Sequence, residues 1–228
     1  MKYSEFQNIM SEPRMTRYLM ACQNDSKKAM TLYRLNLRLS QELFTVISCF
    51  EIALRNKIDQ NYSNFRGTDW LRDSIRINGM FSVEKCRNTA KLIKIRFGKL
   101  GIVYSHNKLV ALMDFGFWRY LFAQPQFHAG GQSLMNVFPS RPVSTPNFKY
   151  NHTFIFNELN KVNDIRNRIA HHEAICFQRG TAMIDTSYIR LHYGLVIQFF
   201  QWMNIDEGAL LYGLDHVIAT CNKIDNII

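Results

Sequence analysis

The chain has 228 residues, a length that fits one domain or one domain with an insertion. Hydrophobic residues make up 47% of it, which is enough to bury a sizeable core and argues against intrinsic disorder. The formal net charge is +10, and this excess of cations favours a polyanionic partner such as nucleic acid.

Helical periodicity is the main pattern along the chain, and few stretches resemble strands. We predict a first long helix over residues 26–62, opened by a cap at Asp25 or Ser26. Later helices are predicted at about 82–97, 107–123, 150–172, 186–203 and 207–226. Residues 124–147 contain Pro and Gly, which predicts a loop with room for one short helix.

These elements predict an all-α bundle in a single domain over residues 1–228. Core helices are expected at about 26–65 and 149–228. A helical and loop elaboration at about 66–148 is expected between these two core halves.

Cysteine spacing and apolar runs indicate the compartment. Five scattered cysteines never form a CxxC spacing, so we expect neither a disulfide framework nor a zinc site. The N-terminus lacks the apolar centre of a signal peptide. The most apolar late run, LVIQFFQWM, is far shorter than the roughly 20 residues of a membrane span. We therefore expect a soluble protein of the cytoplasm without a membrane partner.

The helix predicted at 150–172 carries polar residues beside its apolar face. That face consists of Ile155, Leu159, Val162, Ile165 and Ile169. Arg166 falls on the same face, where a charge is costly unless it is paired or lies at an interface. Asn167 and His171 are four residues apart and share a flank beside it. The helix therefore presents a cation, an amide and a group that titrates near neutral pH.

Other interpretations of this cluster stay open. Helices often end in Arg, Asn and His, because cations suit the negative end of the helix dipole. The adjacent His171 and His172 are compatible with metal ligands, but no third ligand stands at a recognised spacing. We therefore expect no metal and no cofactor.

The first long helix contains an acid in an apolar setting. Between Phe44 and Leu54 nearly every residue is apolar, and Glu51 is the only charge. Because a buried acid needs a partner, we predict that Glu51 pairs with or orients Arg166 across a helix–helix contact. Arg55 follows one turn later, and we expect it to join the same polar pocket.

The polar cluster matches a known pattern. RNRIAHHE resembles the Arg-Asn-x-x-x-His motif of HEPN domains, with Arg166, Asn167 and His171 at the three positions. Four blocks are similar, in order, to the Abi (abortive infection) family of bacterial defence proteins and span about residues 11–177. They are SEPRMTRYLMACQNDSKKAMTLYRLNLRLSQELF, FEIALRNKI, DFGFWRYLF and DIRNRIAHHEAI. Many relatives have HHEPI where this chain has HHEAI, and no block matches after about Phe177.

The resemblance implies a HEPN-like helical core and a homodimer whose two motifs meet near the two-fold axis. It also implies a metal-independent endoribonuclease toxin, restrained in some relatives by a small structured RNA. In that chemistry the 2′-hydroxyl of the RNA attacks the neighbouring phosphate. We assign His171 as general acid or base and Arg166 as stabiliser of the phosphate charge. Asn167 is assigned as an orienting residue, with His172 and Glu173 as secondary candidates.

A basic segment suggests where RNA binds. Residues 85–99 hold six cations, and Arg87, Lys91 and Lys94 follow one another on one helical face. We interpret these three residues as a stripe that contacts RNA phosphates. An equally supported alternative is a solvated helix face over an apolar underside formed by Leu92 and Ile95.

Two rival functions also stay open. One is a non-catalytic RNA-binding or scaffolding HEPN protein, in which the cluster only binds RNA or stabilises the dimer. The other is a HEPN toxin whose motif is modified by a partner protein. Loss of toxicity on the substitution His171→Ala would favour catalysis over binding.

Overall fold

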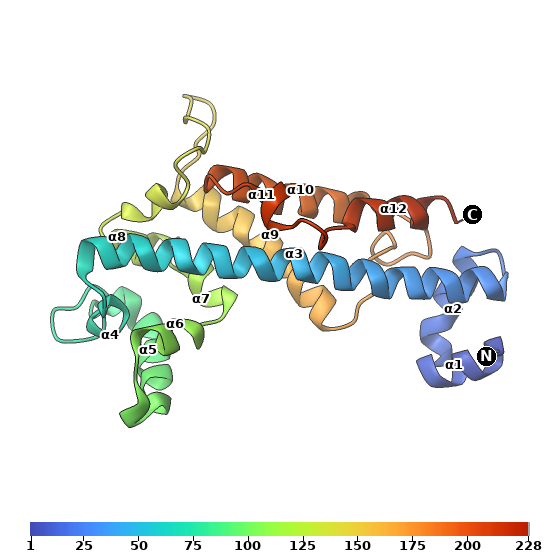
Figure 1. The fold of residues 1–228 in the computed structure, drawn as a ribbon, viewed down its shortest axis with the longest axis horizontal. Coiled ribbons are helices and arrows are strands. Elements are labelled where there is room, and N and C mark those ends of the chain that lie inside the picture. The colour runs from blue at the N-terminus through green and yellow to red at the C-terminus, as the bar shows by residue number, and fades with distance from the viewer. Residues whose placement is uncertain (228) are drawn as a thin grey trace. The chain divides into compact units, whose positions relative to one another are not determined.

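Helices form nearly all of the regular structure in the computed structural model, which describes residues 1–227 (Figure 1). Within this range there is no strand, and an isolated antiparallel bridge joins Phe177 to Ile184. The predicted all-α class is confirmed. The α-helices are α1 (Tyr3–Met10), α2 (Glu12–Ala21), α3 (Ser26–Arg66), α4 (Trp70–Asp73), α5 (Arg87–Leu100), α6 (His106–Ala111), α7 (Phe115–Tyr120), α8 (Gln124–Ala129), α9 (His152–Ala170), α10 (Ser187–Trp202), α11 (Glu207–Leu210) and α12 (Val217–Asp225). Short 3-10 segments are η1 (Glu84–Cys86), η2 (Gly101–Val103) and η3 (Ser133–Val137).

The longest helix, α3, has 41 residues and contains neither Gly nor Pro. Its start confirms the predicted cap, because Asp25 Oδ1 accepts hydrogen bonds from the N–H groups of Lys27 and Lys28 at 2.9 and 3.0 Å. These backbone donors, Lys28 first, hold the pKa of Asp25 below its usual value. The helix ends at Arg66, before Gly67, whose φ of +91° suits glycine.

Several boundaries differ from the predictions. The segment expected as one helix at 107–123 forms α6 and α7, because the Asp114 side chain accepts from the N–H of Phe117 at 2.9 Å and starts a new helix. The segment expected at 207–226 forms α11 and α12, interrupted by Gly213 with a φ of +72°. The predicted loop at 124–147 contains both α8 and η3. The short helices α1, α2 and α4 were not predicted.

The chain divides into two compact units. Unit 1 comprises residues 1–48, 164–197 and 207 onward, and unit 2 comprises residues 49–163 and 198–206. In unit 2, α4, α5 and α6 pack against one another (Figure 1). The predicted single domain, with an elaboration at about 66–148, stays a prediction.

The core of unit 2 is aromatic, and the half-buried Asp59 forms a polar link beside it. The Phe50 ring lies 5.5 Å from Phe199 and 5.6 Å from Phe200, centroid to centroid. Asp59 Oδ1 accepts hydrogen bonds from Trp70 Nε1 and from His106 Nε2, each at 2.7 Å. Burial acts to raise the pKa of Asp59, but these hydrogen bonds, His106 first, outweigh burial and hold it below its usual value.

The lowered pKa of Asp59 predicts an acid-dependent loss of stability. Such a carboxyl stabilises the fold above its unfolded pKa near 4, and this contribution is lost as the pH falls through the lower folded value. We expect Asp59→Asn to lower the free energy of unfolding by about 1–3 kcal/mol at pH 7. Below about pH 4, the free energy of unfolding of this variant should decline less steeply than that of the wild type. Urea unfolding at several pH values measures both effects, and equal pH dependence in the two proteins would contradict this assignment.

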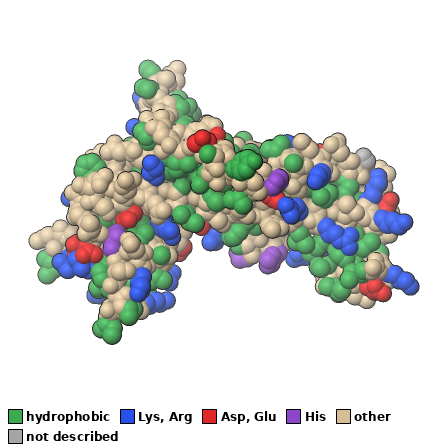
Figure 2. All heavy atoms as spheres, viewed as in Figure 1, with side chains coloured by type: hydrophobic (Ala, Val, Ile, Leu, Met, Phe, Trp, Pro, Cys, Tyr) green, Lys and Arg blue, Asp and Glu red, His purple; other side chains and the backbone are tan. Residues whose placement is uncertain are grey.

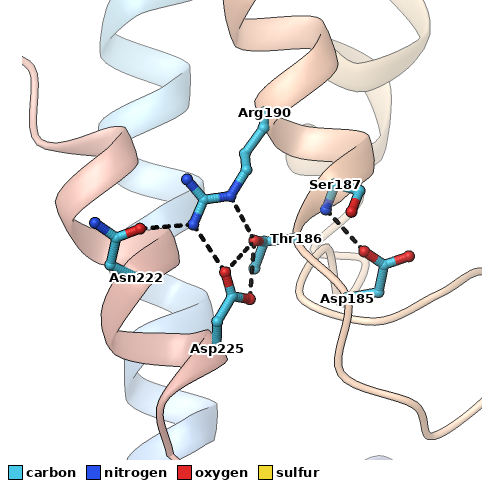
Figure 3. A network of polar contacts seen from close by, with 6 residues as sticks. All are labelled: Asp185, Thr186, Ser187, Arg190, Asn222 and Asp225. Carbon is cyan, nitrogen blue, oxygen red and sulfur yellow. Dashed lines mark hydrogen bonds and ion pairs between the residues drawn. The ribbon is translucent and has the colours of Figure 1, made fainter.

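In unit 1, a polar network joins the start of α10 to α12 (Figure 3). Arg190 donates to Asn222 Oδ1 at 2.7 Å and to Asp225 Oδ2 at 2.8 Å. The Thr186 hydroxyl donates to the Asp225 carboxylate and accepts from Arg190 Nε at 3.1 Å. Asp185 Oδ1 accepts from the N–H of Ser187 at 2.8 Å, which caps α10. The network therefore holds the segment that leads into α10.

The described surface carries many cations. Blue Lys and Arg side chains are spread widely over the face drawn in Figure 2, with fewer red Asp and Glu side chains. This agrees with the net charge of +10. None of the helices within residues 1–227 combines the length and the apolar character that a membrane span requires.

Candidate functional site

The residues of the predicted motif lie at the end of α9. All five residues of the predicted apolar face are buried: Ile155, Leu159, Val162, Ile165 and Ile169. Arg166 and Asn167 are half-buried in the last turns of the helix, and His171 is exposed just beyond it. The helix fixes the backbone of Arg166 and Asn167, and the turn that follows it fixes that of His171, whose side chain remains accessible to a ligand.

A specific turn ends α9. The N–H of Glu173 donates to the carbonyl of Arg168, and the N–H of His172 donates to the carbonyl of Ile169, both at 3.0 Å. These two bonds form a Schellman ending, in which one residue takes the left-handed conformation. Here that residue is His172, with a φ of +55°, a conformation that costs a residue with a Cβ about 1–2 kcal/mol. The turn places His171 and His172 among the residues that line a cavity.

The cavity lies within unit 1 and has a volume of about 580 Å³. Three segments line it: the first turns of α2, the turn after α9, and the loop around Gly180. Its Arg, His and acidic lining residues are Arg14, Arg17, Arg168, His171, His172, Glu173 and Arg179. Four arginines against one carboxylate make this lining strongly cationic, which suits an anionic ligand.

An aromatic cluster fixes the wall that α2 forms. Tyr18 of α2 is buried, and its ring lies 5.1 Å from Tyr33 of α3 and 4.9 Å from Phe177, centroid to centroid. Phe6 of α1 packs on Tyr33 at 5.5 Å. Burial of these rings stabilises the short helices α1 and α2, which have little stability alone.

The loop around Gly180 is a small hairpin, and Arg17 of α2 holds it in place. The hairpin contains the Phe177–Ile184 bridge. Arg17 Nε donates to the carbonyl of Thr181 at 2.6 Å, and its Nη2 donates to the carbonyl of Gln178 at 3.0 Å. The same guanidinium lies 4.5 Å from the centre of the Phe177 ring. One arginine therefore fixes the position of the hairpin tip relative to α2.

The carboxylate in the cavity is already paired. Arg168 Nε donates to Glu173 Oε2 at 2.8 Å, and the Arg168 guanidinium lies 4.9 Å from the centre of the Tyr188 ring. The Arg168 side chain is only 14% exposed, and its bond to Glu173 stabilises the turn after α9. Within residues 1–227, no three His, Cys, Asp or Glu side chains gather where a metal ion could be held.

A known protein family has a sequence model that covers most of the cavity lining. The family model described as Abi-like protein matches residues 2–176, about three quarters of the chain. The chain belongs to the Abi-like protein family. Its family name denotes abortive infection, a defence response. No curated protein and no solved structure matches the chain.

The cavity of this Abi-like protein brings together part of the predicted site. His171, His172 and Glu173 line it, whereas Arg166 and Asn167 are not among its lining residues. Both lie on α9 within one to two turns of His171, in the same unit. The catalytic roles assigned to the motif stay predictions.

The predicted partners on α3 belong to unit 2. Glu51 and Arg55 are both half-buried there. Arg55 Nε donates to the side-chain oxygen of Asn56 at 3.3 Å. The pairing of Glu51 with Arg166 stays a prediction.

Sequence reasoning missed all four arginines that line the cavity: Arg14, Arg17, Arg168 and Arg179. Arg14 and Arg17 are three residues apart and so share a face of α2, a pattern that would have been visible had that helix been predicted. Arg179 has no such local pattern. It lies after residue 176, where the match to the Abi-like family ends.

A second basic hollow lies in unit 2, with a volume of about 360 Å³. Arg87, Lys91 and Lys94 all line it, together with Arg76. The three predicted stripe residues are exposed, and Arg87 Nη1 lies 3.6 Å from Glu84 Oε1. The predicted underside of α5 was partly wrong. Ile93 and Thr89 are the buried residues, while Ile95 is 48% exposed because it lies on another face.

Proposed function

We propose that this Abi-like protein is a metal-independent endoribonuclease toxin of a phage-defence or toxin–antitoxin system, with a HEPN-like core. The observation that supports this most directly is that His171 lines a cavity walled by four arginines. A titratable imidazole beside fixed cations suits phosphate-transfer chemistry on a polyanion. The protein acts in the cytoplasm, where its RNA targets are.

The proposed reaction is internal transfer of the phosphate. The RNA 2′-oxygen bonds to phosphorus and gives its proton to a base, while the 5′-oxygen leaves and receives a proton from an acid. His171 supplies one of these proton transfers. Arg166 stabilises the extra negative charge at phosphorus with its planar fork of donors, and Asn167 orients the imidazole or a phosphate oxygen. The products are a 2′,3′-cyclic phosphate and a 5′-hydroxyl.

The proposal includes a homodimer in which two motifs face each other. A second copy of the chain would supply the second imidazole, so that one His171 acts as base and the other as acid. Light scattering coupled to size-exclusion chromatography measures the mass, and an active monomer would contradict this part of the proposal.

The direct test uses purified protein and a mixed pool of tRNA, ribosomal RNA and messenger RNA in EDTA. The expected result is cleavage that leaves cyclic-phosphate and 5′-hydroxyl ends. If the protein binds this pool tightly but never cuts it, the scaffolding function replaces the nuclease. The arginine-rich cavity favours that second function as much as the first, because binding needs only the cations.

We also propose that the hollow of unit 2 binds RNA phosphates through Arg87, Lys91 and Lys94. Its ligand is the substrate RNA or a structured RNA that restrains the toxin. We expect the triple substitution of these residues to alanine to weaken RNA binding by about 10- to 100-fold near 0.1 M salt. The slope of log affinity against log salt should fall by about 2, at roughly 0.7 per lost contact.

Fluorescence anisotropy across a salt series measures both quantities. The matched control replaces three other exposed lysines of unit 2, Lys99, Lys108 and Lys149, and removes the same charge. If both triple variants lose the same slope, the effect reflects net charge, and α5 is the solvated face of the alternative interpretation.

A further inference from the structure

We propose that Arg14 and Arg179 bind the RNA phosphates that flank the one attacked at His171, and that Arg17 is a positioning residue for Arg179. This inference rests on the proposed ribonuclease function. It assigns residues that lie outside the HEPN motif to binding of a single-stranded RNA substrate. Arg14 and Arg179 lie on separate segments of the cavity wall, with His171 on a third.

Arg179 lies at the tip of a hairpin whose backbone is well defined. The N–H of Gln178 donates to the carbonyl of Met183 at 2.9 Å, and the N–H of Thr181 donates to the carbonyl of Gln178 at 3.1 Å. Gly180 follows Arg179 with a φ of +79°, which is the conformation that a tight turn requires and that favours glycine. Arg179 is therefore presented on a closed turn rather than on a loose loop.

The side chain of Arg17 is engaged in holding this turn. Its guanidinium donates to two hairpin carbonyls and lies against the Phe177 ring, so its geometry is fixed by the protein. Arg14 Nη1 donates to the carbonyl of His172 at 3.3 Å, and its side chain is otherwise exposed. Arg14 and Arg179 thus retain N–H donors for a ligand, whereas Arg17 donates to the carbonyls of the hairpin.

The size and the charge of the cavity favour a nucleotide chain over a small anion. A volume of about 580 Å³ is typical of clefts for ligands of nucleotide size. The single carboxylate, Glu173, is neutralised by Arg168, so the two exposed arginines act on the ligand without competition from it. Arginine forks suit phosphate oxygens, and two such forks on separate segments of the lining can bind two phosphates of one single strand.

The test measures binding separately from cleavage. The probe is a short 2′-O-methyl RNA, which lacks the nucleophile and cannot be cut. For the double variant Arg14→Ala and Arg179→Ala, we expect about a 25-fold loss of affinity near 0.1 M salt and a salt slope lower by about 1.4. The double variant Arg14→Lys and Arg179→Lys should keep the wild-type slope. Replacing Lys28 and Lys223, two exposed lysines of unit 1, by alanine is the charge-matched control and should leave the slope unchanged.

Arg17→Lys separates positioning from charge. This substitution keeps the cation but removes the two hydrogen bonds from the guanidinium to the hairpin carbonyls. We therefore expect the salt slope of Arg17→Lys to fall toward that of Arg179→Ala alone. An unchanged slope would show that Arg17 does not position Arg179. Equal affinity for a 3′-mononucleotide and for the oligonucleotide would replace the chain-binding role with a single-anion site.

The two proposals can fail separately. If wild-type protein binds the probe through both arginines but cuts no RNA, the ribonuclease proposal fails and the binding assignment stands. If wild-type protein cuts RNA and the double alanine variant binds with an unchanged slope, the binding assignment fails. Circular dichroism of each variant distinguishes loss of binding from loss of fold. If the alanine variant is unfolded, the double lysine variant and Arg17→Lys provide the test.

Discussion

Replacing His171 by alanine is expected to lower the rate of RNA cleavage by about 10²- to 10⁴-fold, the usual contribution of one general acid–base group. The side chain is exposed and lies after the last residue of α9, so its removal should not disturb the helix. Binding of a 2′-O-methyl RNA should change little, because the cavity keeps Arg14 and Arg179, the two arginines proposed to bind phosphates. The measurement is the initial rate of cleavage in EDTA, beside the affinity for the uncleavable probe.

The matched control is His128→Ala, which removes an exposed histidine from α8 in unit 2. It should cut RNA at the wild-type rate. An unchanged rate for His171→Ala would remove this residue from the chemistry. A parallel loss of binding and cleavage would instead make His171 a binding residue.

The largest loss of stability near the cavity is expected for Asn36→Leu, at about 2–5 kcal/mol. Asn36 is 4% exposed on α3, and its Oδ1 accepts hydrogen bonds from the N–H groups of Ile175 and Cys176 at 2.9 and 3.1 Å. Leucine fills a similar volume but leaves both buried donors unsatisfied, at roughly 1–3 kcal/mol each. Urea unfolding followed by circular dichroism gives the change in unfolding free energy.

Asn36→Asp tests the cause, because it keeps an oxygen that can accept from both N–H groups. We expect it to lose less stability than Asn36→Leu near neutral pH. Thr31→Ala, on the exposed side of the same helix, should shift the unfolding free energy by less than about 0.5 kcal/mol. Equal stability of wild type and Asn36→Leu would mean that the segment after Glu173 is held by other contacts.

The long helices could be predicted because their apolar period persists over many turns. The start of α3 was predictable from Asp25, and the face of α9 from five apolar residues at helical spacing. Short elements were missed for a physical reason. The helices α1 and α2 are stabilised by tertiary packing of Phe6 and Tyr18 rather than by their own sequences. The break before α7 depends on one side-chain cap, at Asp114, within an otherwise helical pattern.

The motif was predictable from local sequence, and the cavity around it was not. Arg166, Asn167 and His171 lie within six residues of one another, so their relation follows from helix geometry. Arg17 contacts Thr181, which is 164 residues away along the chain. No periodicity links such positions, and only the packed structure places Arg14 and Arg179 in the same cavity as His171.

The hydrogen bond from the Cys176 N–H to Asn36 has a consequence for thiol chemistry. Burial raises the pKa of the Cys176 thiol to about 12, and burial also raises the pKa of Cys22, Cys86 and Cys221. Because the thiolate is the reactive form, these four side chains resist alkylation while the fold is closed, whereas Cys49 is half-buried. The rate at which a maleimide labels Cys176 therefore reports how often the segment beside the cavity opens, and the measurement needs no engineered cysteine.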